Sequence, residues 1–181
     1  MTDIVRTALI LGGARSGKSG FAQGLAENSG RKPVLIATAQ ALDDEMAARI
    51  AHHRADRGSV WGVLEEPLDL VGALAREAIN DNITVVDCLT LWIGNLMCAE
   101  LEVALECERL IEAVTLVRAP VIFVSNEVGS GIVPDNAMAR TFRDYQGRLN
   151  QRLAQACDHV VLVVAGCPLQ VKPATRVDLQ F

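Results

Sequence analysis

Apolar runs of strand length alternate along the chain with segments in which apolar residues recur at helical spacing. The runs predict strands at 7–11, 34–37, 60–64, 83–87, 121–125 and 160–165. The helical spacing predicts helices at 18–28, 43–57, 68–79, 101–117 and 136–156. Strands that alternate with helices in this way favour right-handed crossovers. We therefore expect an α/β fold, a mostly parallel sheet with helices on both faces, in a single domain over residues 1–181.

The segments that follow the predicted strands are rich in glycine, polar groups and acids. In a parallel sheet, ligands bind in the crevice beyond the carboxyl ends of the strands. The segments in question are 12–19, 38–40, 87–90, 125–135 and 166–167. They are the part of the sequence where a binding site is expected.

The composition narrows the classes of partner. Half of the 181 residues are apolar and the formal net charge is -5, so neither a nucleic-acid partner nor insertion into a membrane is indicated. No basic and apolar leader precedes the first predicted strand, and no apolar run reaches the ~20 residues that cross a bilayer. We expect a cytoplasmic protein.

The cysteines are odd in number and form no CxxC pair. They are Cys88, Cys98, Cys107, Cys157 and Cys167. This pattern predicts small buried or half-buried thiols in a reducing compartment, and neither disulfides nor a zinc site.

The segment after the first predicted strand, GGARSGKS, satisfies the phosphate-loop pattern GxxxxGK[ST] between a strand and a helix. Its glycines let several backbone N–H groups turn toward phosphate oxygens, and the following helix adds the positive end of its dipole. Lys18 can reach the terminal phosphates, and Ser19 can bind Mg²⁺. The predicted phosphate-binding residues are Gly12, Gly13, Ala14, Arg15, Ser16, Gly17, Lys18 and Ser19.

Asp87 ends the apolar strand predicted at 83–87, where a phosphate-loop protein places an acid to hold Mg²⁺ or its water shell. Two features of known phosphate-loop proteins are absent from the sequence, which narrows the class of protein further. The guanine-reading Asn-Lys-x-Asp motif of switch GTPases is replaced by Ser125-Asn126-Glu127-Val128 at the comparable position, and no long insertion resembles a kinase lid. A small-molecule kinase stays open at this point.

Two of the three histidines, His52 and His53, are adjacent on the helix predicted at 43–57. At ~100° per residue, His53 shares a stripe with Met46 and Ile50, whereas His52 projects away from it. The position of His53 favours a histidine satisfied in the core. His52 alone would be a surface residue, but beside a phosphate loop it could act as a general base or attack phosphorus. The arginines of this segment, Arg49, Arg54 and Arg57, could stabilise phosphate oxygens.

Several segments together carry a family resemblance. They are GGARSGKS at 12–19, IATAQ at 36–40, DDEMAARIAHHR at 43–54, SNEVGSGIVP at 125–134, ARTFRD at 139–144 and GRLNQRL at 147–153. In this order they resemble the bifunctional adenosylcobinamide kinase / adenosylcobinamide-phosphate guanylyltransferase family of cobalamin biosynthesis. The resemblance implies a RecA-like P-loop NTPase fold and a homotrimer.

The resemblance implies two reactions. ATP or GTP phosphorylates adenosylcobinamide, and GMP from GTP then passes through a covalent GMP-histidine to adenosylcobinamide phosphate, with release of pyrophosphate. Matched by position, the modified histidine is His52. Mg²⁺ would be bound by Ser19 and Asp87, although members of the family often carry Glu at the latter position. The nucleotide site would comprise residues 12–19 with Thr38, Ala39, Gln40, His53, Arg54, Ala55, Asp56, Glu65 and Asp87.

Two other functions are consistent with a phosphate loop. One is a monofunctional metabolite kinase in which His52 is only a surface residue. The other is a RecA-like nucleotide-binding module that acts through assembly. Neither the base that takes the hydroxyl proton in a kinase step nor the corrinoid-binding residues are indicated by the sequence.

The helix predicted at 136–156 has an apolar stripe of Met138, Phe142, Tyr145 and Leu149, which we expect to face the core. Its arginines at 140, 143 and 148 lie off this stripe, where they could bind phosphate, contact another subunit or be solvated.

Overall fold

The computed structural model describes residues 5–41, 58–79 and 81–173. The strands are β1 (Thr7–Gly12), β2 (Lys32–Ala37), β3 (Gly62–Glu65), β4 (Asn82–Asp87), β5 (Val121–Asn126), β6 (His159–Val164) and β7 (Cys167–Lys172). The helices are α1 (Lys18–Glu27), α3 (Leu70–Glu77), α4 (Leu89–Cys98), α5 (Val103–Leu116) and α6 (Ala137–Ala156). The α/β class expected from the sequence is confirmed.

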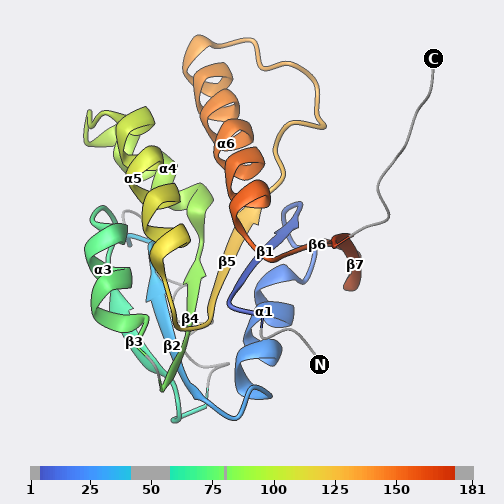
Figure 1. Cartoon of the computed structure of the whole chain (residues 1–181). Coiled ribbons are helices and arrows are strands. Elements are labelled where there is room, and N and C mark those ends of the chain that lie inside the picture. Colours follow the sequence, from blue (N-terminus) through green and yellow to red (C-terminus); the bar gives the residue numbers. More distant parts are fainter. Residues whose placement is uncertain (1–4, 42–57, 80, 174–181) are drawn as a thin grey trace, which may run out of the picture.

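The strands form one sheet in the order β3-β2-β4-β5-β1-β6-β7 (Figure 1). Strands β1 to β6 pair in parallel, and β7 runs antiparallel to β6. The carboxyl ends of β1 to β6 therefore meet at one edge of the sheet. Because β5 lies between β1 and β4, the strands that carry the phosphate loop and Asp87 are not neighbours.

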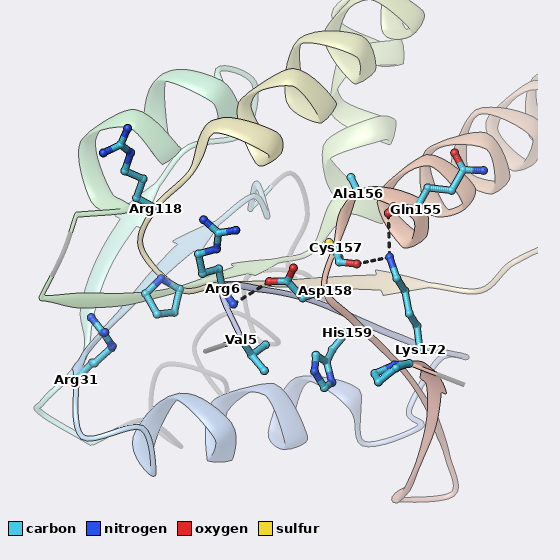
Figure 2. A pocket seen from close by; sticks show the side chains of 12 residues that line it. Val5, Arg6, Arg31, Arg118, Gln155, Ala156, Cys157, Asp158, His159 and Lys172 are labelled. Atoms are coloured by element: carbon cyan, nitrogen blue, oxygen red, sulfur yellow. Dashed lines mark hydrogen bonds between the residues drawn. The ribbon is translucent and has the colours of Figure 1, made fainter. Parts of the chain in front are cut away.

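At the opposite edge, the junction between α6 and β6 is bonded to the start of β1. Asp158 Oδ2 accepts hydrogen bonds from Arg6 N (2.9 Å), Thr7 N (3.0 Å) and Thr7 Oγ1 (3.3 Å), the first of which Figure 2 shows. Burial alone would raise the pKa of the Asp158 carboxyl, but these hydrogen bonds outweigh it and hold that pKa below its usual value. Nearby, Lys172 Nζ donates to the last carbonyls of α6, including Gln155 O (2.8 Å).

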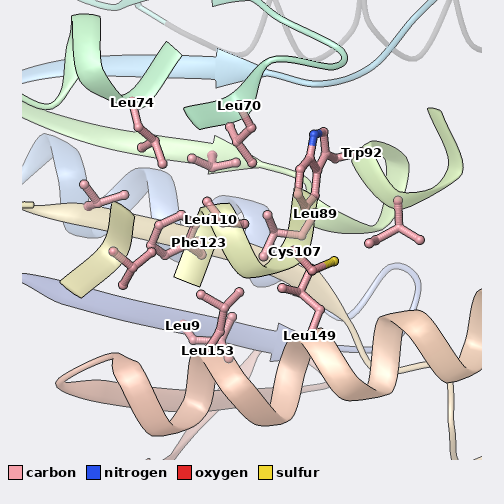
Figure 3. Close-up of a cluster of buried hydrophobic side chains, with 14 of the residues drawn as sticks. Leu9, Leu70, Leu74, Leu89, Trp92, Cys107, Leu110, Phe123, Leu149 and Leu153 are labelled. Atoms are coloured by element: carbon pink, nitrogen blue, oxygen red, sulfur yellow. The ribbon is translucent and has the colours of Figure 1, made fainter. Parts of the chain in front are cut away.

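The core is divided by the sheet into two hydrophobic clusters, because alternate side chains of each strand point to opposite faces. Ile122 and Val124 of β5 pack with Ala22 of α1 on one face. Phe123 packs on the other face with residues of α3 to α6, the cluster that Figure 3 shows. The central strands are therefore buried on both faces, which explains their nearly continuous apolar sequence.

The predicted strands are all confirmed, with ends that shift by one or two residues. The helices predicted at 18–28, 68–79, 101–117 and 136–156 are also confirmed. The helix predicted at 43–57 lies outside the described residues. Residue 165 was included in the last predicted strand but instead begins a turn, with Ala165 at φ 50° and Gly166 at φ 80°.

Two elements were not predicted. Helix α4 contains no charged residue, and its large side chains Leu89, Trp92, Ile93 and Leu96 are completely buried. The contrast between an apolar and a polar face, by which a helix is recognised in a sequence, is therefore absent. Strand β7 is an exposed edge strand that contains Pro168, which is a residue that weakens a strand prediction.

The stripe on α6 is only partly buried. Leu149 is buried, and Phe142 and Tyr145 pack at the border of the core. Met138, which we expected in the core, is 74% exposed because it lies on the first turn of α6, beyond the neighbouring helices (Figure 1).

The cysteines are all free thiols. Burial raises the pKa of Cys88 to about 11, and those of Cys107 and Cys157 to about 12. Cys98 and Cys167 are exposed, so the expectation of buried or half-buried thiols is wrong for these two. Both lie at the end or the beginning of an element, where the core does not reach.

None of the helices in the described ranges combines the length and the apolar composition needed to cross a bilayer.

The Asp158 junction gives a testable pH dependence. A carboxylate whose pKa is depressed in the folded state stabilises it fully above the unfolded pKa of about 3.9, and this contribution disappears as the pH falls through the folded pKa. Asp158→Asn should therefore lower the free energy of unfolding by about 1 kcal/mol at pH 7, with a smaller deficit at pH 3. Urea unfolding at the two pH values measures both quantities.

Asp144→Asn is the matched control, because Asp144 is exposed and its one ion pair among the described residues is with Arg143 (3.6 Å). This substitution should change the free energy of unfolding by no more than about 0.5 kcal/mol at both pH values. An Asp158→Asn deficit of equal size at pH 7 and pH 3 would contradict the pKa assignment.

Candidate functional site

The phosphate loop, residues 12–19, connects β1 to α1 at the carboxyl edge of the sheet. Arg15 (φ 56°) and Gly17 (φ 93°) both have left-handed backbone conformations, and Ser16 N donates to Gly13 O (3.3 Å). Alternation of right- and left-handed residues makes a concave turn in which successive N–H groups can face an anion. Since α1 begins at Lys18, its N-terminus adds positive potential to the same turn.

Gly12 has no space for a side chain. A Cβ atom there would overlap with Ser16 Oγ and lie 2.6 Å from Val163 O. Ser16 Oγ itself is buried and has no hydrogen-bond partner among the described residues. The phosphate loop thus packs directly on the backbone of β6.

The turn between β6 and β7 supports the phosphate loop from the side. Gly166 N donates to Ser16 O (2.8 Å). A Cβ atom at Gly17 would lie 3.3 Å from Gly166 Cα, so the two backbones are nearly in contact. Segment 166–167 therefore belongs to the crevice, as its position after a strand predicted, and it acts through its backbone.

Lys18 is held inside the turn. The residue as a whole is 9% exposed, and Nζ donates to Gly13 O (3.2 Å). The ammonium group is thereby kept at the mouth of the loop, where it can exchange the carbonyl for a phosphate oxygen. Ser19, the following residue, is half-buried in the first turn of α1.

The turn after β4 is fastened to the end of β2 by Thr38, which is completely buried. Thr38 Oγ1 donates to Cys88 O (2.7 Å) and accepts from Cys88 N (2.9 Å). Thr38 N donates to Asp87 O (3.3 Å), and the peptide bond between Asp87 and Cys88 is cis. The hydroxyl of Thr38 therefore fixes the backbone that carries the half-buried Asp87 carboxylate. A direct contact of Thr38 with nucleotide stays a prediction.

Polar residues at the end of β5 form a buried network with α6. Ser125 Oγ donates to Asn150 Oδ1 (2.7 Å) and accepts from Gln146 Nε2 (2.8 Å). Asn150 Nδ2 in turn donates to Asn126 O (3.0 Å). Sequence reasoning missed Gln146 and Asn150, because polar residues inside a helix are usually solvated. The available signal was the pair Ser125 and Asn126 at the end of an apolar strand.

The loop after β5 is ordered by Glu127. Its carboxylate accepts hydrogen bonds from Ser130 Oγ (2.6 Å) and Gly129 N (2.7 Å). The bond from the Ser130 hydroxyl is the main cause that holds the pKa of Glu127 below its usual value. Glu127 N donates to Gly12 O (3.1 Å), so this loop starts at the phosphate loop.

The structure brings most of the described site residues to one edge. In the register of the sheet, Ala37 is paired with both Asp87 and Glu65, so residues 38–40 leave β2 between these two acids. Glu65 lies on the edge strand and is exposed. His52, His53, Arg54, Ala55 and Asp56 lie outside the described residues.

A cavity of about 990 Å³ lies at the opposite edge of the sheet, where the strands begin (Figure 2). Its charged lining includes Arg6, Arg31, Arg118 and Lys172. Since the phosphate loop is at the carboxyl edge, this cavity is not part of the nucleotide site described above.

Residues 8–171 match the family described as "Cobinamide kinase / cobinamide phosphate guanyltransferase". The chain belongs to this family. The matched range runs from β1 to β7 and contains all predicted site residues. The protein is thus a bifunctional cobinamide kinase and cobinamide phosphate guanylyltransferase of adenosylcobalamin biosynthesis, and the resemblance seen in the sequence is confirmed.

Similar relatives are bifunctional adenosylcobalamin biosynthesis proteins. CobP of Pseudomonas aeruginosa is 47% identical over 166 residues, which cover 91% of this chain and 96% of the relative. CobU of Salmonella typhimurium is 41% identical over 179 residues, with 91% and 98% covered. CobU of Escherichia coli K12 is 39% identical over 179 residues, with the same coverage.

Solved structures of low sequence identity share the fold. The RadB recombinase superposes with a TM-score of 0.52 at 17% identity, covering 87% of this chain and 73% of the other. A protein from Pyrococcus horikoshii OT3 superposes with a TM-score of 0.54 at 10% identity, covering 93% and 88%. The RecA-like P-loop fold predicted from the sequence is confirmed.

The packing at Gly12 predicts a binding defect. Gly12→Ala should weaken binding of GTP by about tenfold or more, because the added methyl group must displace Ser16 and reshape the loop. Titration with a fluorescent GTP analogue measures the affinity. Gly24→Ala in α1 is the control, since nothing lies within 4 Å of a Cβ atom there. The control should keep its affinity, and unchanged binding by Gly12→Ala would contradict the close packing.

Proposed function

We propose that both reactions of this enzyme use the phosphate loop as their single triphosphate site. In the first, the γ-phosphoryl group of ATP or GTP passes to a hydroxyl of adenosylcobinamide. In the second, GMP from GTP passes through His52 to adenosylcobinamide phosphate. The observation that carries this proposal is the gathering of the loop, Lys18, Ser19 and Asp87 at one edge of the sheet.

The roles of the site residues follow from their positions. Backbone N–H groups of residues 12–17 would bind the β- and γ-phosphates, and Lys18 would neutralise charge on them. Residues 38–40, His53 to Asp56 and Glu65 would bind the rest of the nucleotide. Asp87 and Glu65 flank the end of β2, which places carboxylates on either side of residues 38–40.

Ser19 and Asp87 fit a magnesium ion. A hydroxyl and a carboxylate are the hard oxygen ligands that Mg²⁺ takes beside phosphate and water. When bound, the ion would neutralise charge that develops on the phosphates. Thr38 supports the fit, because it fixes the backbone on which the Asp87 carboxylate is mounted.

In the guanylyl transfer, an unprotonated nitrogen of His52 attacks the α-phosphorus of GTP. The P–N bond forms as the P–O bond to pyrophosphate breaks. A phosphate oxygen of adenosylcobinamide phosphate then attacks the same phosphorus, and the P–N bond breaks to restore the imidazole. Arg49, Arg54 and Arg57 would stabilise the phosphate oxygens in both steps.

The position of the third histidine supports this assignment. His159 begins β6, whereas the phosphate loop lies at the other end of the sheet. Gly12 is paired with Val163, four residues beyond His159, so at about 3.3 Å per residue the strand separates the imidazole from the loop by roughly 13 Å. His159 is therefore excluded as the attacking histidine, which leaves the pair at 52 and 53 as the candidates.

The two reactions need different geometries, because the α- and γ-phosphorus atoms occupy different places along the triphosphate. Either the nucleotide shifts in the loop, or the segment that carries His52 moves. We also propose that the enzyme acts as a homotrimer in the cytoplasm, without nucleic acid or membrane as partner.

The covalent step is tested with GTP labelled at the α-phosphate. Incubation with Mg²⁺ followed by denaturation should give label on the protein that is lost in acid and survives in base, as a phosphoramidate does. His52→Ala should abolish the label. His159→Ala should keep it, because this imidazole lies at the wrong edge of the sheet.

Label that persists in His52→Ala, or that is lost in base and stable in acid, would contradict the histidine intermediate. Transfer of the label to adenosylcobinamide phosphate, with recovery of unlabelled enzyme, tests the second half of the reaction.

A further inference from the structure

Asn126 lies between the two halves of the nucleotide site. It ends β5, the strand inserted between β1 and β4. In the register of the sheet it is paired with Gly12, the first residue of the phosphate loop, while Val124 two residues earlier is paired with Asp87. No role for this residue follows from the sequence motifs.

The backbone of Asn126 is fixed on both sides. Its N–H donates to Thr90 Oγ1 (2.8 Å), at the start of α4, and its carbonyl accepts from Asn150 Nδ2 (3.0 Å) of α6. Gln146 Nε2 holds Asn150 in turn (3.1 Å). The next N–H, that of Glu127, donates to Gly12 O (3.1 Å). The backbone of Asn126 therefore cannot move away from the phosphate loop without breaking this network, and its side chain starts from a fixed position beside the loop.

The side-chain carbonyl of Asn126 has no hydrogen-bond donor in the described part of the chain. Oδ1 is buried and has no hydrogen-bond partner among the residues that the structure describes. Ser16 Oγ, which lies close to Gly12 on the loop side, is buried and without a partner in the same way. Buried polar atoms are nearly always paired, so two such atoms beside one phosphate loop indicate groups that meet a ligand.

We propose that Asn126 is a catalytic residue of the kinase step. Its Oδ1 accepts a hydrogen bond from the cobinamide hydroxyl, and its amide N–H groups donate to the transferred phosphoryl group. A neutral amide suits this place, because it offers an acceptor and donors side by side and adds no negative charge near the triphosphate. The proposal rests on the placement of the γ-phosphate in the loop given under the proposed function.

In this step the hydroxyl oxygen attacks the γ-phosphorus, and the bond to the β-phosphate oxygen breaks. The nucleoside diphosphate leaves with that electron pair. The hydroxyl proton passes to an oxygen of the transferred group. Asn126 aligns the hydroxyl and does not take the proton, so the step requires no general base at this position.

The guanylyl transfer has no acceptor hydroxyl, which makes the two activities separable. Asn126→Ala should lower kcat of the kinase reaction by about 100-fold, with less than threefold change in KM for the nucleotide. Formation of the GMP-enzyme and its transfer to supplied adenosylcobinamide phosphate should stay within threefold. Asn126→Ser is the second variant. It should reduce kinase activity at least tenfold, and formation of the GMP-enzyme should again stay within threefold.

Asn28→Ala is the matched control, because Asn28 is exposed and its side chain donates to Gly24 O (2.7 Å) at the end of α1, away from the phosphate loop. It should keep both activities. Equal loss of both activities in Asn126→Ala and Asn126→Ser would show a merely structural role, and full kinase activity in either would also overturn the proposal. Failure of the proposed function is distinct from these outcomes, since it would appear in other variants, as label that persists in His52→Ala or as nucleotide binding that is unchanged in Gly12→Ala.

Discussion

The lack of space for a side chain at Gly12 sets the geometry of the phosphate loop. With no side chain at this position, the phosphate loop lies directly on the backbone of β6 and against Ser16. The loop is then held by neighbours on both flanks, through Gly166 on one side and Glu127 on the other. A larger residue would separate the loop from the strands whose ends supply the other groups of the site.

Buried hydroxyl and amide groups at the carboxyl edge perform a common task. Thr38, Thr90, Ser125 and Asn150 each bind a backbone group or a second side chain of a different element. They hold the ends of neighbouring strands in fixed positions, which a hydrophobic contact would not specify as strictly. Asn126 differs, because its side-chain oxygen is buried and has no hydrogen-bond partner among the described residues.

The fold was largely predictable because it rests on local patterns. Each parallel strand is an apolar run, and the phosphate loop has a fixed spacing of glycine, lysine and serine. Helix α4 was missed because burial on all sides removes its periodicity, and β7 because an exposed edge strand has none. Met138 was misplaced because the helical period gives the direction of a side chain and not how far the neighbouring helices extend.

The site was only half predictable. Gly12 to Ser19 and Asp87 could be found because their chemistry is encoded in short motifs next to strands. Gln146 and Asn150 could not, since what makes them part of the site is the strand order, which brings β5 between β1 and β4. Such long-range neighbours leave no signal in a single sequence.

The strand order also has a consequence for folding of the chain during its synthesis on the ribosome. The phosphate loop leaves the exit tunnel well before β5 and β6, but the pairing partners of β1 in the described sheet are β5 and β6, and the loop is bonded to Gly166. A nascent chain must therefore keep β1 unpaired until β5 (Val121–Asn126) has been translated. Such late closure favours slow folding and gives chaperones a long period in which to bind the exposed strand.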